Sequence, residues 1–209
     1  IFDPRPIVTL TEELFPGRGR ELSERWRTRQ FEYTWLRTLS GHYVDFEHTT
    51  RDALIYAAHA LKLKLETASA DQLVHAYFQL KAWPDVLPAI TALKNAGIRL
   101  GFLSNFTRSM LESNVQNSGL GGFFDHVLST DLAQAFKPDP RAYQLGVDAF
   151  RLERDEMVFA AFAGWDAAGA KAFGYPTFWV NRQNAPAEEL GTPPDATGGI
   201  AELVTFVLG

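Results

Sequence analysis

The chain has 209 residues, and its 25 Asp and Glu outnumber its 20 Lys and Arg, which gives a formal net charge of −5. This balance leaves no basic footprint for nucleic acid, and no apolar run approaches the roughly 20 residues that cross a bilayer. The absence of cysteine excludes disulfides and thiolate chemistry and fits a protein of the cytoplasm. The length suits one large domain, or a core with a smaller inserted domain.

Helical signals run from about residue 6 to residue 80, with no strand pattern among them. Residues that can cap a helix precede the apolar stretches, and Pro16-Gly17 ends the first helix. We expect helices over residues 9–15, 21–39, 49–61 and 69–80. The cap of the third is expected within Thr49–Asp52. Together these segments predict a small helical bundle.

The helix over residues 21–39 has two distinct faces. Apolar residues at helical spacing form a stripe suited to the core of the bundle: Leu22, Trp26, Tyr33 and Leu36. The second face combines one arginine with aromatic and threonine side chains: Arg27, Phe31, Thr34, Trp35 and Thr38. The simplest interpretation of Arg27 is a side chain that reaches solvent from a partly buried face.

From residue 82 onward the sequence alternates between helices and strands. Apolar runs of strand length, followed by helix-forming sequence, predict parallel strands over residues 98–103, 123–128, 157–162 and 177–181. Helices are expected over residues 86–95, 107–118, 141–150 and 167–173. Residues 184–199 are interpreted as a loop, and residues 200–208 as a helix or a strand. This alternation is typical of an α/β fold with a parallel sheet.

Polar residues follow these strands where each strand ends. Ligands of such sheets bind outside the carboxyl ends of the strands, so Ser104, Asn105 and Asp166 are expected close together. Lys137 lies between the second and third strands, next to Pro138 in a segment whose prolines restrict the backbone. A hydroxyl, an amide, an ammonium and a carboxylate at one sheet edge predict a chemical site.

The order of these elements predicts two domains. Residues 1–5 and 82–209 would form a Rossmann-like core, and residues 6–81 a helical cap inserted near its N-terminus. If residues 1–2 follow a first strand of the sheet, the insertion begins just after the carboxyl end of that strand. The cap would then cover the sheet edge that holds the polar residues and enclose a small, largely dry pocket.

Several stretches resemble one known family. The order of Ser104-Asn105, Lys137-Pro138 and Asp166 is similar to that of the haloacid dehalogenase (HAD) superfamily. More specific stretches, which resemble the cap and core of the L-2-haloacid dehalogenases, are residues 15–20, 26–37, 41–46, 136–143 and 164–171. The resemblance covers essentially the whole chain. It implies a HAD-type core with a helical cap, and a hydrolase that acts on carbon–halide bonds. We expect a cytoplasmic homodimer that needs neither cofactor nor metal.

The resemblance also implies where the nucleophile lies. In the family, a nucleophilic aspartate belongs to an Asp-x-x-Gly-Thr segment just before the residues that match Ile1-Phe2-Asp3. Asp3 therefore matches a position after the motif and is not the nucleophile. Because the sequence begins with Ile1 rather than Met, we expect the nucleophile a few positions upstream.

The family pattern implies roles in binding and in charge pairing for four residues. Arg27 would capture halide or substrate carboxylate with a permanent charge. Ser104 and Asn105 would bind the substrate carboxylate at a helix N-terminus, although a strand end that caps a helix is the alternative. Lys137 would pair with the nucleophile and with Asp166 and keep both ionised. The alternative for Lys137 is a solvated loop lysine.

The remaining expectations concern the water and the pocket. Asp166 would orient or deprotonate the hydrolytic water, with the N-cap of a helix from Ala167 as its second interpretation. Tyr143 resembles the tyrosine that the family has near this cluster, and a core aromatic is the alternative. Bulky side chains expected in the pocket wall are Phe31, Phe46, Phe162 and Trp165.

The chain departs from the family just before Asp166. Where the dehalogenases have a serine and an asparagine, this sequence has Ala161 and Ala163, so the pocket loses two polar side chains. We therefore expect small substrates, namely haloacetates, including fluoroacetate, and 2-halopropionates. The products would be 2-hydroxy acids, formed through an aspartyl ester.

Two other functions compete with this hypothesis. A phosphatase of the superfamily needs an acidic Mg²⁺ ligand about four positions before Asp166, where this chain has Phe162. A binding protein that keeps only the fold is conceivable, because fold does not imply function. Such a protein has no evident reason to keep Arg27, Ser104 and Lys137 together with Asp166. The sequence therefore favours the dehalogenase.

Overall fold

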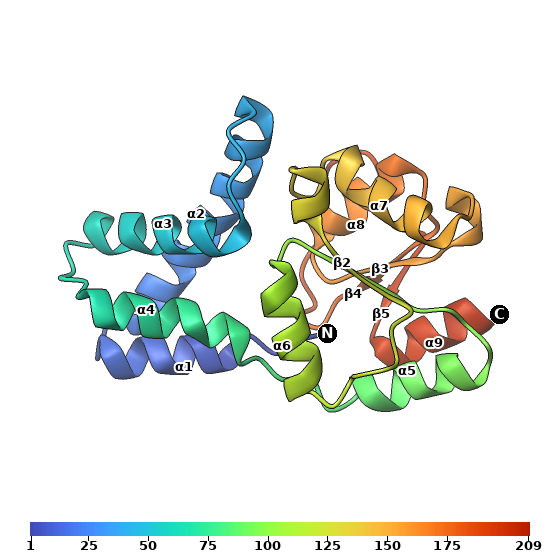
Figure 1. The fold of residues 1–209 in the computed structure, drawn as a ribbon, viewed down its shortest axis with the longest axis horizontal. Coiled ribbons are helices and arrows are strands. Elements are labelled where there is room, and N and C mark those ends of the chain that lie inside the picture. Colours follow the sequence, from blue (N-terminus) through green and yellow to red (C-terminus); the bar gives the residue numbers. More distant parts are fainter.

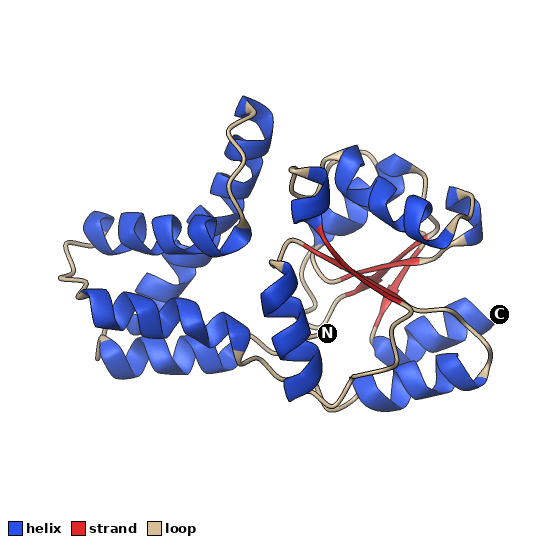
Figure 2. Ribbon diagram, viewed as in Figure 1, coloured by secondary structure: helices blue, strands red, loops and turns tan.

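The computed structural model describes residues 1–209 and shows two groups of elements side by side (Figure 1). One group, which we call the helical unit, contains helices and no strand (Figure 2). Its elements are α1 (Arg5–Leu14), α2 (Gly19–Ser40), α3 (Phe46–Ala60), α4 (Thr67–His75) and the short 3-10 helix η1 (Ala76–Phe78). The predicted helical bundle is therefore present.

The limits of these helices follow local backbone rules. α2 ends at Gly41, whose φ of 70° lies in the left-handed region that glycine adopts without a steric penalty. α3 begins at Phe46, because the side chain of Asp45 accepts a hydrogen bond from the backbone N–H of His48. The cap predicted within Thr49–Asp52 was wrong, since Thr49 and Thr50 are buried inside the helix.

The long helix α2 packs on α1 and α3, and its last turns project beyond the other helices in Figure 1. Leu22 and Trp26 are buried in the core of the helical unit, as their spacing predicted. Leu36 is 55% exposed and Leu39 84% exposed, so the predicted core stripe was wrong at Leu36. The helix simply extends past the core that its first half covers.

The second group, the sheet unit, follows an α/β order. Its helices are α5 (Val86–Asn95), α6 (Arg108–Asn117), α7 (Pro140–Phe150), α8 (Gly164–Phe173) and α9 (Ile200–Leu208), with the 3-10 helices η2 (Thr130–Ala133) and η3 (Arg154–Glu156). Its strands are β1 (Gly101–Ser104), β2 (His126–Ser129), β3 (Phe159–Ala161), β4 (Thr177–Val180) and β5 (Ala196–Gly198). In Figure 1, α7 and α8 lie on one side of the strands and α5 and α9 on the other. The α/β class is thus confirmed.

The strands pair in parallel, as the sequence predicted. β1 pairs with β2, and β4 lies between β3 and β5 in a second sheet. The strands are shorter than the apolar runs suggested, and β5 was missed within the loop expected over residues 184–199. The Ala-Thr-Gly sequence of β5 carries no apolar alternation, so only its pairing with β4 reveals it.

The chain passes between the two units through a paired segment. Phe2 and Ala82 form an antiparallel bridge. The backbone N–H of Asp3 donates to Lys81 O at 2.8 Å, and that of Trp83 to Ile1 O at 3.0 Å. The exit from the sheet unit and the return to it are therefore adjacent. No helix of the structure combines the length and apolarity needed to span a membrane.

Candidate active site

The carboxyl ends of β1 and β3 are joined by one lysine. Lys137 Nζ donates to Asp166 Oδ2 at 2.7 Å and to Leu103 O at 3.4 Å. Both charged residues are buried, Lys137 with 8% and Asp166 with 5% of its surface exposed. The structure thus brings together the ammonium and the carboxylate that the strand order predicted, and Lys137 is not a solvated loop lysine.

Two buried charges are tolerated only when their remaining hydrogen-bonding atoms are also paired. Tyr143 supplies a partner, because its hydroxyl donates to Asp166 Oδ1 at 2.8 Å and to Asp166 O at 3.2 Å. Burial, and then the adjacent negative charge, raise the pKa of Tyr143 far above its usual value. Tyr143 therefore stays a neutral donor, and both carboxylate oxygens of Asp166 are held.

This cluster requires a close approach between α7 and α8. α7 begins at Pro140 after Asp139, whose side chain accepts from Arg141 N–H, and this start places Tyr143 in the first turn. A Cβ on Gly169 of α8 would lie 2.6 Å from Pro138 Cβ and 2.7 Å from the Tyr143 hydroxyl. Only glycine fits there. The sequence analysis missed Gly169, although the run of small residues around it was a signal of close helix packing.

Asp166 lies inside α8 rather than at its cap. The helix begins at Gly164, and Ala163 at the N-cap position has no side-chain hydrogen bond to offer. The alternative of Asp166 as the cap of a helix from Ala167 was therefore wrong. A carboxylate in the first turn is still favoured by the helix dipole, whose positive end lies there.

Ser104 ends β1 and Asn105 follows it, next to the backbone of Lys137. The side-chain oxygen of Asn105 accepts from the backbone N–H of Lys137 at 3.0 Å and from the Thr130 hydroxyl at 3.4 Å. Ser104 Oγ accepts from Phe106 N–H at 3.1 Å, which fixes the turn before α6. Asn105 thus positions the backbone of Lys137, while its amide NH₂ donates no hydrogen bond within residues 1–209 and is available to a ligand.

Arg27 reaches this region from α2 of the helical unit. Its guanidinium makes no hydrogen bond or ion pair with any of residues 1–209, and it is held between aromatic rings. Its Cζ lies 5.2 Å from the ring centre of Phe31 and 5.5 Å from that of Phe162 in the loop between β3 and α8. The donors of this permanent cation are therefore available to an anion.

Aromatic residues connect the second face of α2 to the first turn of α8 and to the loop before it. The Trp165 ring meets Phe31 edge-on at 5.4 Å and Trp35 edge-on at 5.6 Å. Phe162 is 41% exposed, so part of its ring is open to solvent beside Arg27. Phe46 lies apart from this group, buried between the units with its ring centre 5.1 Å from that of Phe106. Its contact with substrate stays a prediction.

Residues 8–174 match the model of the haloacid dehalogenase-like hydrolase family. The chain is 40% identical over 208 residues to haloacetate dehalogenase H-2 of Moraxella sp. (strain B), covering 100% of this chain and 93% of that relative. It is 42% identical over 195 residues to an (S)-2-haloacid dehalogenase of Pseudomonas sp. (strain YL), covering 93% and 84% of the two chains.

Solved structures agree with these relatives. The L-2-haloacid dehalogenase RSc1362 superposes with a TM-score of 0.98 at 40% identity, over 100% of this chain and 94% of its own. The L-2-haloacid dehalogenase from Xanthobacter autotrophicus with chloropropionic acid covalently bound superposes with a TM-score of 0.92 at 32% identity, over 100% of this chain and 94% of its own. The defluorinating L-2-haloacid dehalogenase Rha0230 superposes with a TM-score of 0.80 at 25% identity, over 98% of this chain and 89% of its own.

Proposed function

Because this chain belongs to the haloacid dehalogenase-like hydrolases, we propose that it hydrolyses the carbon–halogen bond of short 2-haloalkanoic acids to give 2-hydroxy acids. One observation carries the proposal. A buried Lys137–Asp166 ion pair lies in the sheet unit, and aromatic contacts link the loop before α8 and the first turn of α8 to the unpartnered cation Arg27. The first group suits acid–base chemistry and the second suits an anion.

The first step is a displacement at the α-carbon. The family resemblance assigns the nucleophile to an aspartate upstream of Ile1. Its carboxylate oxygen attacks the α-carbon, the carbon–halogen bond breaks with its electron pair, and the halide leaves toward Arg27. Ser104, the amide of Asn105 and the backbone N–H groups that open α6 would hold the substrate carboxylate. The covalent chloropropionic acid named for the Xanthobacter structure supports an ester intermediate.

The second step cleaves that ester. Water attacks the carbonyl carbon of the aspartyl ester and gives up a proton to Asp166. The bond from that carbon to the ester oxygen then breaks, and the departing alkoxide takes the proton from Asp166 and leaves as the 2-hydroxy acid. The restored aspartic acid loses its remaining proton to solvent. Lys137 supplies a positive charge to the Asp166 carboxylate, which its ammonium contacts at 2.7 Å, and would do the same for the nucleophile. Tyr143 holds Asp166 in the orientation that the water needs. Ala161 and Ala163 supply no polar side chain for this water.

The full-length protein, including the segment upstream of Ile1, tests this function directly. Halide and 2-hydroxy acid would be measured with fluoroacetate, chloroacetate, 2-chloropropionate and 2-chlorobutyrate. We expect release from the two- and three-carbon acids, and lower kcat/KM for the four-carbon acid, because bulky side chains are expected in the pocket wall. The difference should be limited, because an apolar pocket discriminates by only about 1–3 kcal/mol per methylene. Haloacetate dehalogenase H-2 and the defluorinating relative support the inclusion of both acetates. No halide release from any acid would contradict the proposal.

The domain limits are proposed as residues 1–5 and 82–209 for the core and residues 6–81 for the cap. The paired segment around Phe2 and Ala82 supports them, because the chain crosses between the units there twice. A location in the cytoplasm is also proposed, and it rests on the absence of cysteine.

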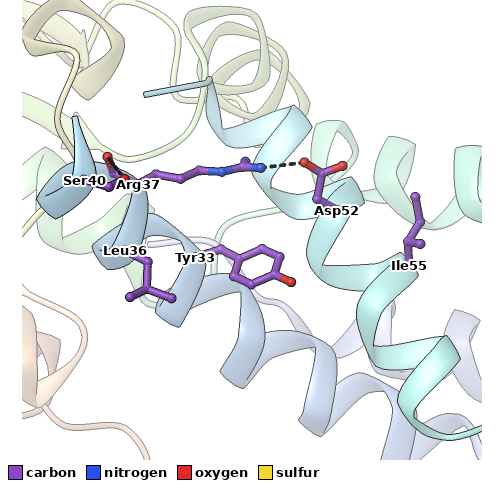
Figure 3. A pocket seen from close by; sticks show the side chains of 6 residues that line it. All are labelled: Tyr33, Leu36, Arg37, Ser40, Asp52 and Ile55. Atoms are coloured by element: carbon purple, nitrogen blue, oxygen red, sulfur yellow. Dashed lines mark hydrogen bonds and ion pairs between the residues drawn. The ribbon is translucent and has the colours of Figure 1, made fainter. Parts of the chain in front are cut away.

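A homodimer is the assembly that we propose. A hollow on the helical unit is lined by Tyr33, Leu36, Arg37, Ser40, Asp52 and Ile55 (Figure 3). Leu36, Leu39 and Ile55 are large exposed apolar side chains of α2 and α3, and an ion pair of 2.6 Å joins Arg37 to Asp52 beside them. Exposed apolar groups rimmed by charges favour a protein interface. Light scattering should give twice the mass of one chain, and a monomer would contradict the proposal.

A further inference from the structure

The helical unit contacts the segment just before Lys137 at three points. Tyr43, between α2 and α3, donates a hydrogen bond from its hydroxyl to Asp131 Oδ1 in η2. Its ring also lies on Phe136, with the ring centres 4.9 Å apart. Thr38, in the last turn of α2, accepts a hydrogen bond of 3.0 Å at Oγ1 from the backbone N–H of Phe136. None of these contacts joins a residue that the proposed reaction uses.

The same segment, residues 130–137, is bound to the sheet unit on its other side. Asp131 N–H donates to Ser129 Oγ at 3.1 Å, and the Thr130 hydroxyl donates to Asn105. At its end, the backbone N–H of Lys137 donates to Asn105 as well. The segment is therefore held between the two units, and Lys137 is its last residue.

Resting on the proposed function, we propose that Tyr43 and Thr38 are positioning residues for Lys137. By fixing Asp131 and Phe136 from the helical unit, they set the place of the Lys137 ammonium against Asp166. Turnover then depends on the helical unit being docked on residues 130–137. This is a role for the cap in addition to carrying Arg27.

The placement of Lys137 leaves little tolerance for movement. Its ammonium has one short bond, to Asp166 at 2.7 Å, and one long bond, to Leu103 O at 3.4 Å. Phe136 is buried and joined to Lys137 by a single peptide bond, so a shift of Phe136 moves the lysine backbone with it. A displacement of ~1 Å in a catalytic group can reduce the rate about a hundredfold.

Tyr43→Phe tests the hydroxyl alone, because the ring stays on Phe136. We expect kcat for chloroacetate to fall about tenfold with KM changed less than about twofold, since Arg27, Ser104 and Asn105 are untouched. Tyr56→Phe is the matched control, because the Tyr56 hydroxyl accepts from Arg29 within the helical unit. It should keep wild-type kcat and KM. An unchanged kcat in Tyr43→Phe would overturn the proposal.

Two substitutions of Asp131, which accepts the hydrogen bond from Tyr43, give a second test. Asp131→Asn keeps a carbonyl acceptor for Tyr43 and should retain nearly all of the wild-type turnover. Asp131→Ala removes the acceptor and should resemble Tyr43→Phe. The double variant Tyr43→Phe with Asp131→Ala should be no slower than either single variant, because both remove one interaction. Losses that multiply in the double variant would overturn the proposal.

Thr38 is tested by a matched pair of its own. Thr38→Val keeps the shape but leaves the buried N–H of Phe136 without an acceptor, and kcat should fall as in Tyr43→Phe. Thr38→Ser keeps the hydroxyl and should retain wild-type kcat. Equal turnover in the two variants would contradict a role for this hydrogen bond.

Hydrogen exchange on the full-length protein separates this proposal from the proposed function. Amides of residues 131–137 should exchange faster in Tyr43→Phe than in wild type, with Tyr56→Phe as control. Unchanged exchange overturns the positioning, and so does faster exchange with wild-type kcat. An inactive wild-type protein overturns the proposed function and with it the role of Lys137, whereas an active wild type with an unaffected Tyr43→Phe overturns the positioning alone.

Discussion

The charged groups of the sheet unit are bonded to one another, whereas the cation that the helical unit contributes has no polar partner in the protein. Lys137, Asp166 and Tyr143 form a buried network in which both oxygens of the carboxylate accept hydrogen bonds. Arg27 is half-buried between the rings of Phe31 and Phe162, and its N–H donors are unused by residues 1–209. The two regions meet across the loop before α8.

This difference separates two tasks of one site. A buried ion pair is costly to desolvate and is stable only when complete, and removal of one partner destabilises a protein by about 3–5 kcal/mol. Such a network holds a fixed geometry before any ligand arrives. An unpaired guanidinium beside aromatic rings instead keeps its hydrogen bonds for an anion. Changes in the first region should therefore affect both stability and turnover, and changes in the second mainly the binding of substrate.

The largest effect is expected from Lys137→Ala. It leaves the Asp166 carboxylate buried without its cation, so turnover should fall at least roughly a hundredfold and the midpoint of thermal unfolding should drop. Lys171→Ala is the control, because Lys171 pairs with Asp195 at a surface where about a third of each side chain is exposed. Wild-type turnover in folded Lys137→Ala would remove the sheet-unit network from the mechanism.

Arg27→Lys should have a smaller and different effect. The planar fork that binds carboxylate or halide is lost while a positive charge remains, so KM should rise roughly tenfold. Because Arg27 has no hydrogen bond to the rest of the protein, the midpoint of thermal unfolding of Arg27→Lys should stay near that of wild type. Arg29→Lys, which changes an arginine that stacks on Tyr56, should leave KM unchanged. Destabilisation without a change in KM would show that Arg27 is a packing residue.

Tyr143→Phe sharpens the comparison within the bonded network. It removes one donor to Asp166 and should lower the free energy of unfolding by about 1–3 kcal/mol, with a loss of turnover of only several-fold. The pKa of Tyr143 is raised, so the folded protein keeps a proton that the unfolded chain releases near pH 10. Stability of wild type should therefore fall as the pH rises above about 10. Urea unfolding at pH 8 and pH 11 should show this alkaline loss reduced in Tyr143→Phe.

The smallest effect is expected from metal removal. Phe162 occupies the position where a phosphatase of this fold would supply an acidic ligand, and no cluster of three acidic or histidine side chains lies within residues 1–209. Dialysis against EDTA should leave kcat unchanged. Activity that is lost and then restored by added Mg²⁺ would favour phosphatase-like chemistry instead.

Much of the site was predictable because strand order alone determines it. Ser104 and Asp166 follow parallel strands, and Lys137 lies in the connection between them, so the rule for α/β sheets placed them together before any distance was known. Tyr143 lies in the first turn of α7, beyond the loop that holds Lys137, and its position relative to Asp166 depends on how closely α7 approaches α8. That approach depends on Gly169, and the small residues around it indicate close packing without showing which side chain packs there.

The features that the sequence did not predict depend on contacts between residues far apart in the chain. Tyr43 and Asp131 are separated by 88 positions, so no local spacing in the sequence relates them. Leu36 has the spacing of a core residue but lies beyond the end of the bundle that would bury it. β5 exists because β4 offers it an edge, not because its own three residues favour a strand. Local pattern identifies elements, whereas packing decides which of their residues meet.

The central claim is that hydrolysis passes through an ester on the protein, and single turnover in ¹⁸O-water tests it most directly. The full-length enzyme, in excess over chloroacetate, would be analysed together with its product by mass spectrometry. We expect the label in a carboxylate of the protein and unlabelled oxygen in the 2-hydroxy acid, because water attacks the ester carbonyl and not the α-carbon. Label in the product, with none in the protein, would contradict the ester and the roles derived from it.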